Sequence, residues 1–160
     1  MAHQVETSIV VRKVISRDGT TIAFDRTGQG PAVILVSPAL GARSDLLTAP
    51  LAVLLAPHFT VFSYDRRGRG DSGDTAPYAV EREVEDIEAL ITEAGGSAFA
   101  YGISSGAVLA LEAASKFPTK IKKLALYEPP FIVDDSRPRV PEDYVTQVNE
   151  LIAAGRRGDA

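Results

Sequence analysis

The chain has 160 residues, enough for one domain, and a formal net charge of −4 from seventeen Lys and Arg against twenty-one Asp and Glu. This acidic balance argues against nucleic acid and anionic membrane as partners. With no cysteine and only two histidines, His3 and His58, the sequence excludes disulfides, thiolate catalysis and a cysteine or histidine metal centre, so no metal or cofactor is expected.

The predicted elements alternate between extended and helical runs. The first two strands, 8–16 and 21–26, flank the turn-forming sequence Arg17-Asp18-Gly19-Thr20, which indicates a hairpin. The later elements are strand 32–36, helix 46–55, strand 59–65, a helix from residue 80 that stops at Gly95-Gly96, strand 98–101, helix 106–117 and strand 121–127. Strands that alternate with helices after a hairpin predict an α/β fold with a mostly parallel sheet.

Two of the predicted helices are amphipathic. The helix from residue 80 has apolar residues at helical spacing, and an acidic face is expected opposite them: Glu81, Glu83, Glu85, Asp86 and Glu88. The last helix is predicted within 141–157, with Pro141 in its first turn. The sequence therefore divides into a core, 1–130, and a terminal segment, 131–160.

The pentapeptide Gly102-Ile103-Ser104-Ser105-Gly106 stands between the strand 98–101 and the helix that follows it. This is the setting of a nucleophile elbow, in which a serine occupies a turn so sharp that glycine is needed on both sides. The alternative is a small residue in a tight strand–helix turn. The context favours Ser104 as a nucleophile.

Three segments together resemble the N-terminal part of the α/β-hydrolase fold family. They are the strand 32–36 with Ser37-Pro38-Ala39-Leu40-Gly41, the motif Asp65-Arg66-Arg67-Gly68-Arg69-Gly70-Asp71-Ser72, and the pentapeptide at Ser104. The resemblance covers about residues 8–130 and implies an α/β-hydrolase sheet that is incomplete at its C-terminal edge. The chain departs from the family pattern where Ser37-Pro38 replaces His-Gly and where Arg69 replaces a histidine.

The resemblance implies a serine hydrolase that acts on an ester or a related small-molecule acyl substrate. In this interpretation Ser104 is the nucleophile, and the backbone N–H groups of Ala39 and Ser105 form the oxyanion hole. A serine at the elbow argues against the dehalogenase and epoxide-hydrolase branches, which use a carboxylate. Lipase, esterase, lactonase, thioesterase, perhydrolase and carbon–carbon hydrolase activities all remain open.

No residue of this sequence is expected to act as the general base. In the family an acid and then a histidine follow the elbow, whereas here no histidine follows His58, which is expected at the far end of its strand. Glu128 is a possible acid or a purely structural residue. We therefore expect a chain that stops before the catalytic histidine, inactive alone, with 131–160 as the start of a cap.

Several other interpretations stand beside this one. The main rival is a non-catalytic binding or interaction protein that keeps the hydrolase scaffold. The glycines of 68–73 also fit a dinucleotide-binding spacing, but 74–77 does not start a helix. The arginines of the Asp65 motif are expected to be solvated or paired loop charges. The last strand, 121–127, is expected to expose an edge that self-associates or binds a complementing segment. A start without a signal-peptide pattern predicts a cytoplasmic protein.

Overall fold

The computed structural model describes residues 11–135, 138–156 and 158. They divide into two compact units, a core that ends at Pro130 and a second unit that begins at Phe131. The elements of the core are β1 (Arg12–Ile15), β2 (Thr21–Thr27), β3 (Ala32–Val36), α1 (Thr48–Leu55), β4 (Thr60–Tyr64), α2 (Val80–Glu93), β5 (Ala98–Ile103), α3 (Ser105–Lys116) and β6 (Ile121–Tyr127). The second unit contains α4 (Tyr144–Ala153).

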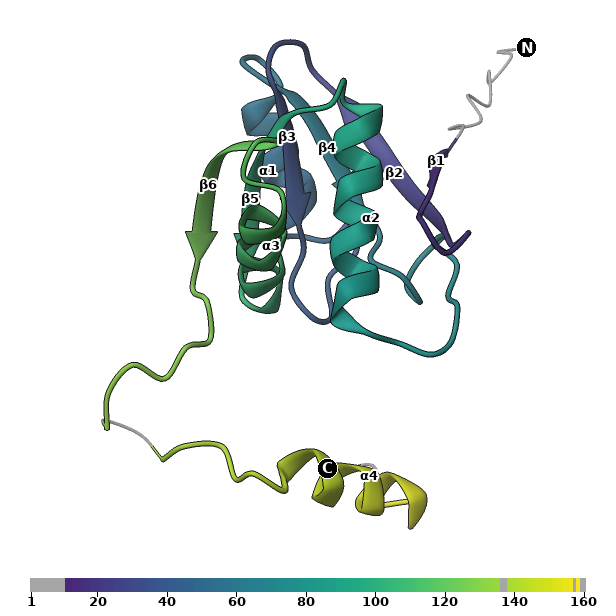
Figure 1. Ribbon diagram of the computed structural model, residues 1–160, viewed down its shortest axis with the longest axis vertical. Helices are drawn as coiled ribbons and strands as arrows, with labels where there is room; N and C mark the ends of the chain where they lie inside the picture. Colours follow the sequence, from purple (N-terminus) through teal and green to yellow (C-terminus); the bar gives the residue numbers. More distant parts are fainter. Residues whose placement is uncertain (1–10, 136–137, 157, 159–160) are drawn as a thin grey trace, which may run out of the picture. The chain divides into compact units, whose positions relative to one another are not determined.

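The six strands of the core form one sheet in the order β1-β2-β4-β3-β5-β6 (Figure 1). β1 and β2 form an antiparallel pair, and β2 is also antiparallel to β4. The pairs β4–β3, β3–β5 and β5–β6 are parallel. The predicted hairpin and the predicted mostly parallel sheet are therefore confirmed.

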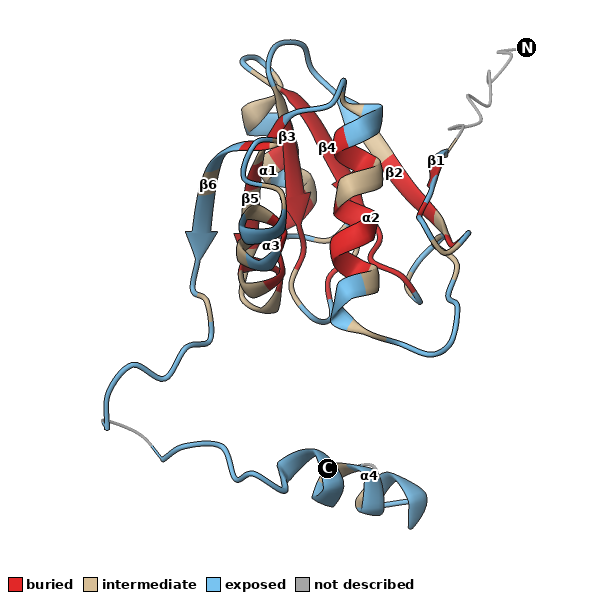
Figure 2. Cartoon of the chain, viewed as in Figure 1, coloured by how far each residue is buried: buried red, intermediate tan, exposed pale blue. Residues whose placement is uncertain are grey.

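Helices cover both faces of this sheet, with α2 and α3 on one face and α1 on the other (Figure 1). The larger apolar cluster lies under α2 and α3, and buried residues follow the inner strands (Figure 2). The smaller cluster lies under α1 and consists of Val33, Leu35, Ala52 and Val61. Burial on both faces explains why β3 is an unbroken apolar run, since strands covered on both sides do not alternate with polar residues.

The start of α1 lies two residues later than the sequence predicted. Asp45 causes this difference, because its Oδ1 accepts hydrogen bonds from the N–H groups of Leu47, at 2.9 Å, and Thr48, at 2.6 Å. A carboxylate that satisfies amide groups at a helix start fixes where the helix begins. Leu47 precedes the helix, which starts at Thr48.

The acidic face predicted for α2 is largely buried, so that expectation was wrong. Glu83, Glu85 and Asp86 are 3%, 4% and 0% exposed. The reason is that Arg66 and Arg67, in the loop after β4, form ion pairs with Glu83 and Asp86 at 2.6 and 2.7 Å. A buried carboxylate is tolerated where an arginine and its hydrogen bonds compensate the charge. Helical spacing alone does not show that such partners exist.

Arg67 joins α2 to the turn between β1 and β2. Its Nε and Nη2 donate to both carboxylate oxygens of Asp86, at 2.9 and 2.7 Å. Its Nη1 donates to Asp18 at 2.9 Å. The hydrogen bond from Arg67 lowers the pKa of Asp18 well below its ordinary value, against the opposing effect of burial. The first hairpin is thus anchored to the helical layer by a charged group.

We expect acid to weaken the fold through this contact. Because the folded-state pKa of Asp18 lies below its unfolded value, its stabilisation is present above about pH 4 and is lost as the pH falls further. Asp18→Asn should lower the unfolding free energy at pH 7 by about 1–3 kcal/mol. It should also flatten the fall in stability between about pH 4 and pH 2. Urea unfolding at a series of pH values measures both effects, with the exposed Asp135→Asn as the control. An unchanged acid slope in Asp18→Asn would contradict the assignment.

The second unit contains one helix, α4, and none of its residues is buried. The helix begins three residues after Pro141, whose carbonyl accepts a hydrogen bond from the N–H of Tyr144 at 3.1 Å. Pro141 therefore lies in a turn that leads into the helix, rather than in its first turn as the sequence predicted. The apolar residues Tyr144, Val145 and Ile152 are exposed.

β6 is the terminal strand of the sheet and pairs with β5 alone among the described strands. Ile121 is its one buried residue, Leu124 is half-buried and the other five are exposed. Two adjacent lysines, Lys122 and Lys123, lie on this strand.

Candidate active site

Ser104 occupies the turn between the end of β5 and the start of α3. Its backbone has φ 53° and ψ −122°, a conformation that side chains with a β-carbon rarely adopt. The turn is held by a hydrogen bond from the Ser104 N–H to the Tyr127 carbonyl at 2.9 Å and by one from the Ala107 N–H to the Ser104 carbonyl at 2.9 Å. Backbone strain of this kind is found mainly at functional sites.

The two glycines of the pentapeptide are required by close backbone packing. A Cβ on Gly102 would lie closer than 3.0 Å to backbone atoms of Gly106 and Ala107. A Cβ on Gly106 would lie closer than 3.0 Å to the carbonyl oxygens of Val36 and Ser37. The first glycine lets α3 turn back over β5, and the second lets α3 contact the end of β3.

The segment after β3 runs beside the elbow. Ser37 is buried, and its hydroxyl forms a hydrogen bond with that of Thr48 at 3.0 Å. The next residues form a turn in which the Gly41 N–H donates to the Pro38 carbonyl at 3.0 Å. Ala39 lies at the exposed tip of that turn. Ser105 is the first residue of α3, and the backbone N–H groups of a first helical turn have no acceptor within the helix.

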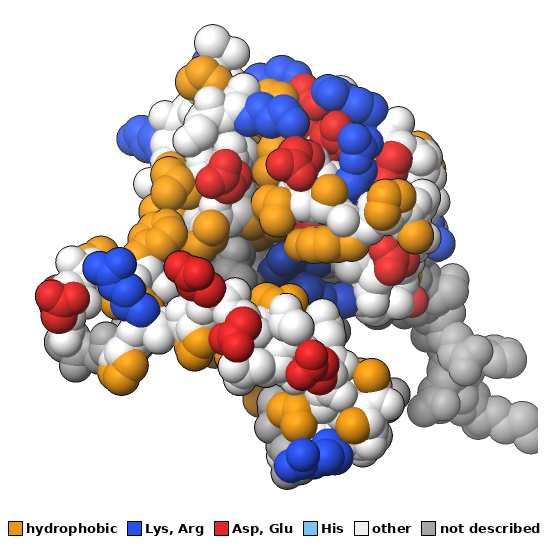
Figure 3. Space-filling view, turned by 60° about the horizontal axis from the view of Figure 1, so that its bottom comes forward, with side chains coloured by type: hydrophobic (Ala, Val, Ile, Leu, Met, Phe, Trp, Pro, Cys, Tyr) orange, Lys and Arg blue, Asp and Glu red, His pale blue; other side chains and the backbone are white. Residues whose placement is uncertain are grey.

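A cleft of about 520 Å³ brings together two of the predicted site residues, Ser104 and Glu128, whereas Ala39 and Ser105 are not among its lining residues. Its lining is mainly apolar and consists of Pro38, Leu47, Leu51, Tyr101, Ile103, Ser104, Tyr127 and Glu128. Glu128 follows β6 directly, is exposed and has a left-handed backbone with φ 48°. Burial, with a smaller contribution from Tyr127, raises the pKa of the Tyr101 hydroxyl. Figure 3 turns toward the viewer the end of the core at which the parallel strands stop.

Arg66 links the elbow to the segment after β3. Its Nη1 donates to the Ser105 hydroxyl at 3.1 Å and to the Ser37 carbonyl at 3.4 Å. Its Nε and Nη2 form two 2.6 Å hydrogen bonds with the two carboxylate oxygens of Glu83. Burial disfavours both charges, but the hydrogen bonds and the Coulombic attraction between them together outweigh it, so the pKa of Arg66 is raised and that of Glu83 is lowered.

A second charged cluster holds the loop after β4 against the loop after β3. Asp65 is buried and accepts hydrogen bonds from the backbone N–H and the guanidinium of Arg43 and from the N–H of Asp71. Gly70 has φ 50°, and a Cβ there would collide with the Asp65 carboxylate. The Asp65 motif therefore shapes the loops beside the cleft. Its partner Arg43 was not predicted from the sequence, because no motif surrounds that arginine.

The sequence of this chain matches a model of a known protein family. A model described as the alpha/beta hydrolase family matches residues 33–159. The chain belongs to the alpha/beta hydrolase family. The resemblance seen in the sequence is thus confirmed, together with the fold that it implied.

Individual relatives agree with this assignment. The chain is 61% identical to an alpha/beta hydrolase from Sphaerobacter thermophilus DSM 20745, with a TM-score of 0.85 over 92% of this chain and 56% of that one. It is 31% identical to the uncharacterized hydrolase YraK of Bacillus subtilis (strain 168). This match runs over 115 residues, which are 69% of this chain and 42% of that protein. It is also 30% identical to the bottromycin epimerase BotH, with a TM-score of 0.70 over 89% of this chain and 56% of that one. The chain thus spans less than half of the curated relative's length.

The remaining sequence candidates lie away from the elbow of this hydrolase-family chain. His58 precedes β4, whereas Ser104 follows β5, and β4, β3 and β5 run parallel, so the two residues lie at opposite ends of the sheet. His3 lies outside the described residues. The glycines of 68–73 lie in a loop, and α2 starts only at Val80, so no helix N-terminus follows them as a dinucleotide site requires. Within the described residues, no helix is long and apolar enough to cross a membrane.

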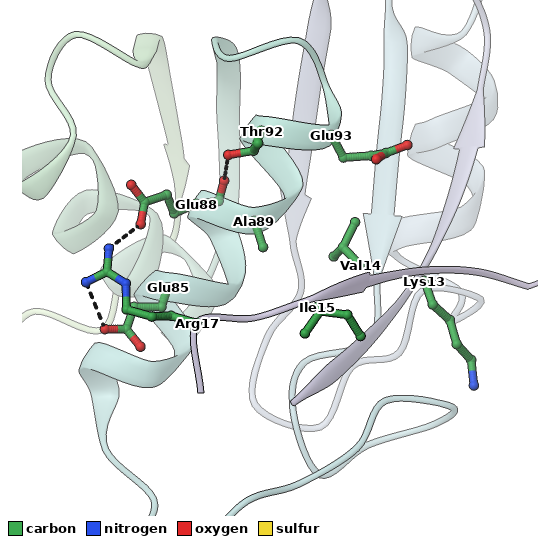
Figure 4. Close-up of a pocket in the computed structure, with 9 residues that line it drawn as sticks. All are labelled: Lys13, Val14, Ile15, Arg17, Glu85, Glu88, Ala89, Thr92 and Glu93. Atoms are coloured by element: carbon green, nitrogen blue, oxygen red, sulfur yellow. Dashed lines mark hydrogen bonds and ion pairs between the residues drawn. The ribbon is translucent and has the colours of Figure 1, made fainter. Parts of the chain in front are cut away.

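A second hollow, of about 440 Å³, lies between β1 and α2 (Figure 4). It is on the far side of the sheet from α1 and contains the carboxylates of Glu85 and Glu88. Arg17 forms ion pairs with both, at 3.5 and 2.8 Å. Arg82 and Lys120 also form ion pairs with Glu85 and Glu88, at 2.8 and 2.7 Å, so both carboxylates of this hollow already have partners within the protein.

Proposed function

We propose that this chain carries the nucleophile and the oxyanion hole of a serine hydrolase that cleaves an ester or a related acyl substrate. The observation that supports the proposal is the strained backbone of Ser104, held between β5 and α3 and lining a cleft. A strained turn presents a hydroxyl outward from the end of the sheet, as nucleophilic attack requires.

The proposed reaction begins when the Ser104 Oγ attacks the acyl carbon while a base takes its proton. The negative charge that develops on the carbonyl oxygen is held by the N–H groups of Ala39 and Ser105. Collapse of this intermediate breaks the bond to the alcohol, which receives the proton and leaves an acyl group on Ser104. Water activated by the same base then releases the acid and restores the serine.

The base in this mechanism is a histidine from outside these 160 residues. His58 lies at the wrong end of the sheet, and no later histidine exists in the sequence. Glu128, which lines the same cleft as Ser104, is the candidate acid that would orient that histidine. The apolar lining of the cleft favours an apolar acyl group as the substrate portion bound there.

A non-catalytic binding protein is the second candidate. It is favoured by Ser37-Pro38, which replaces the His-Gly expected before the oxyanion donor. In this alternative the cleft beside Ser104 binds a ligand without forming a covalent bond.

The two candidates differ in one measurable property, covalent reaction at Ser104. We define the chimera as residues 1–160 extended by the portion of the Sphaerobacter thermophilus hydrolase that this chain does not match. A fluorophosphonate probe should label the folded chimera at Ser104, as located by peptide mass spectrometry, and should leave the 160-residue chain unlabelled. A folded chimera without label would support the binding protein instead.

We also propose that the β6 edge pairs with another strand. Its unpaired N–H and C=O groups can form hydrogen bonds with a further strand. The 160-residue chain should therefore sediment as a mixture of oligomers, whereas the chimera should sediment as a monomer. Analytical ultracentrifugation makes the comparison. A single monomeric species of the shorter chain, with cooperative thermal unfolding, would show that the edge needs no partner.

A further inference from the structure

We propose that Arg66 is a positioning residue that fixes the distance between the two halves of the oxyanion hole; this inference rests on the proposed function. One half is the Ser105 N–H at the start of α3, and the other is the Ala39 N–H in the turn after β3. Arg66 belongs to neither segment. It reaches both through the same atom, since its Nη1 donates to the Ser105 hydroxyl and to the Ser37 carbonyl.

The guanidinium can set this distance because its own orientation is fixed. Two hydrogen bonds to the Glu83 carboxylate, both 2.6 Å long, define the plane of the arginine head group. Glu83 is held in turn by the Tyr78 hydroxyl, which donates to its Oε1 at 2.9 Å. A planar guanidinium gripped on one edge presents its remaining N–H groups in fixed directions. The side chains of Arg66 and Glu83 are 7% and 4% exposed, so solvent does not loosen the contact.

Arg66 acts through other residues rather than on the substrate. Glu83 compensates its charge, and the polar atoms nearest to its free edge belong to the protein backbone and to Ser105. Its effect should therefore appear where the position of the oxyanion donors matters, which is in the transition state, because the negative charge exists only there. Substrate binding in the ground state should change little.

Arg67 provides a matched control within the same loop. It is the next residue, its side chain is 1% exposed, and it also forms two hydrogen bonds with a carboxylate of α2, that of Asp86. Its other contacts are Asp18 in the first hairpin and the carbonyl of Arg82. Arg67 thus has the burial and the ion pair of Arg66 without contact to the elbow or to the segment after β3.

The test removes each arginine together with its carboxylate on α2, so that neither Glu83 nor Asp86 is left as an unpaired buried charge. Arg66→Met/Glu83→Gln is compared with Arg67→Met/Asp86→Asn in the chimera, with p-nitrophenyl butyrate as substrate. Only the Arg66 pair should lower kcat, by about 10- to 100-fold, with KM within about 2-fold of the parent. Inhibition by a trifluoromethyl ketone, which mimics the tetrahedral intermediate, should weaken by a similar factor. Equal losses of kcat in both pairs, or a change confined to KM, would overturn the inference.

A second measurement does not depend on catalysis. Amide hydrogen exchange, followed by mass spectrometry of peptides that span 37–41 and 104–107, should be faster in the Arg66 pair than in the Arg67 pair. If the parent chimera does not hydrolyse the ester, the proposed function fails, but the exchange comparison still decides the role of Arg66. Equal exchange in the two pairs would show that Arg66 holds neither segment.

Discussion

Replacing Ser104 by alanine in the chimera should abolish fluorophosphonate labelling and lower ester hydrolysis by about 10³- to 10⁶-fold. The proposed reaction passes through a covalent bond to the Ser104 Oγ, and alanine has no atom at that position. Alanine keeps the β-carbon, so the strain at φ 53° is the same in both proteins. Release of p-nitrophenol and the mass of the labelled peptide measure the two effects.

Ser115→Ala is the control for this substitution. Ser115 lies on the exposed side of α3, the helix that Ser104 precedes, so the variant changes the same atoms without touching the elbow. It should keep full labelling and full activity. Substantial hydrolysis by Ser104→Ala, with unaltered folding, would mean that the reaction uses another nucleophile.

Replacing Gly106 by alanine should lower the free energy of unfolding by about 2–4 kcal/mol. The new methyl group would collide with the carbonyl oxygens of Val36 and Ser37, and neither belongs to a flexible side chain that could move aside. The helix α3 would have to shift away from β3, which also displaces the amide groups proposed for the oxyanion hole. The free energy of unfolding, measured in urea, and the rate of ester hydrolysis should therefore fall together.

Gly73→Ala tests whether this loss comes from the collision rather than from glycine as such. A Cβ at Gly73 would meet its nearest neighbours at 3.6 Å or more, which is ordinary contact. Its unfolding free energy should stay within about 0.5 kcal/mol of the parent. A similar loss at both positions would show that close packing at Gly106 is not the cause.

The fold was predictable from the sequence because its signals are local. An unbroken apolar run such as 32–36 and the glycine-bearing turn 17–20 identify strands and a hairpin without knowledge of their neighbours. The start of α1 was missed because it depends on the Asp45 carboxylate reaching the N–H of Thr48. The burial of Asp86 was missed because it depends on Arg67, nineteen positions earlier in the sequence.

The candidate site divides in the same way. The pentapeptide around Ser104 is contiguous, so its turn could be predicted from the order of glycine and serine. Arg66 could not be given its place, because its partners Ser105 and Glu83 lie in α3 and α2, and no local pattern brings these two helices to the loop after β4. The sequence indicates only that an arginine in this motif is a solvated or paired loop charge, and the structure shows which groups it pairs with.

The hydrogen bond from the Ser104 N–H to the Tyr127 carbonyl has a consequence for whatever pairs with β6. It ties the nucleophile to the last residue of that strand. The residue number along β6 therefore gives the distance from Ser104. A strand aligned on β6 would place its own residues at steps of about 3.3 Å from the nucleophile. A slip of one residue would turn a side chain meant for Ser104 to the opposite face of the sheet. The alignment of the added strand, and not only its attachment, would therefore decide whether a base reaches the serine.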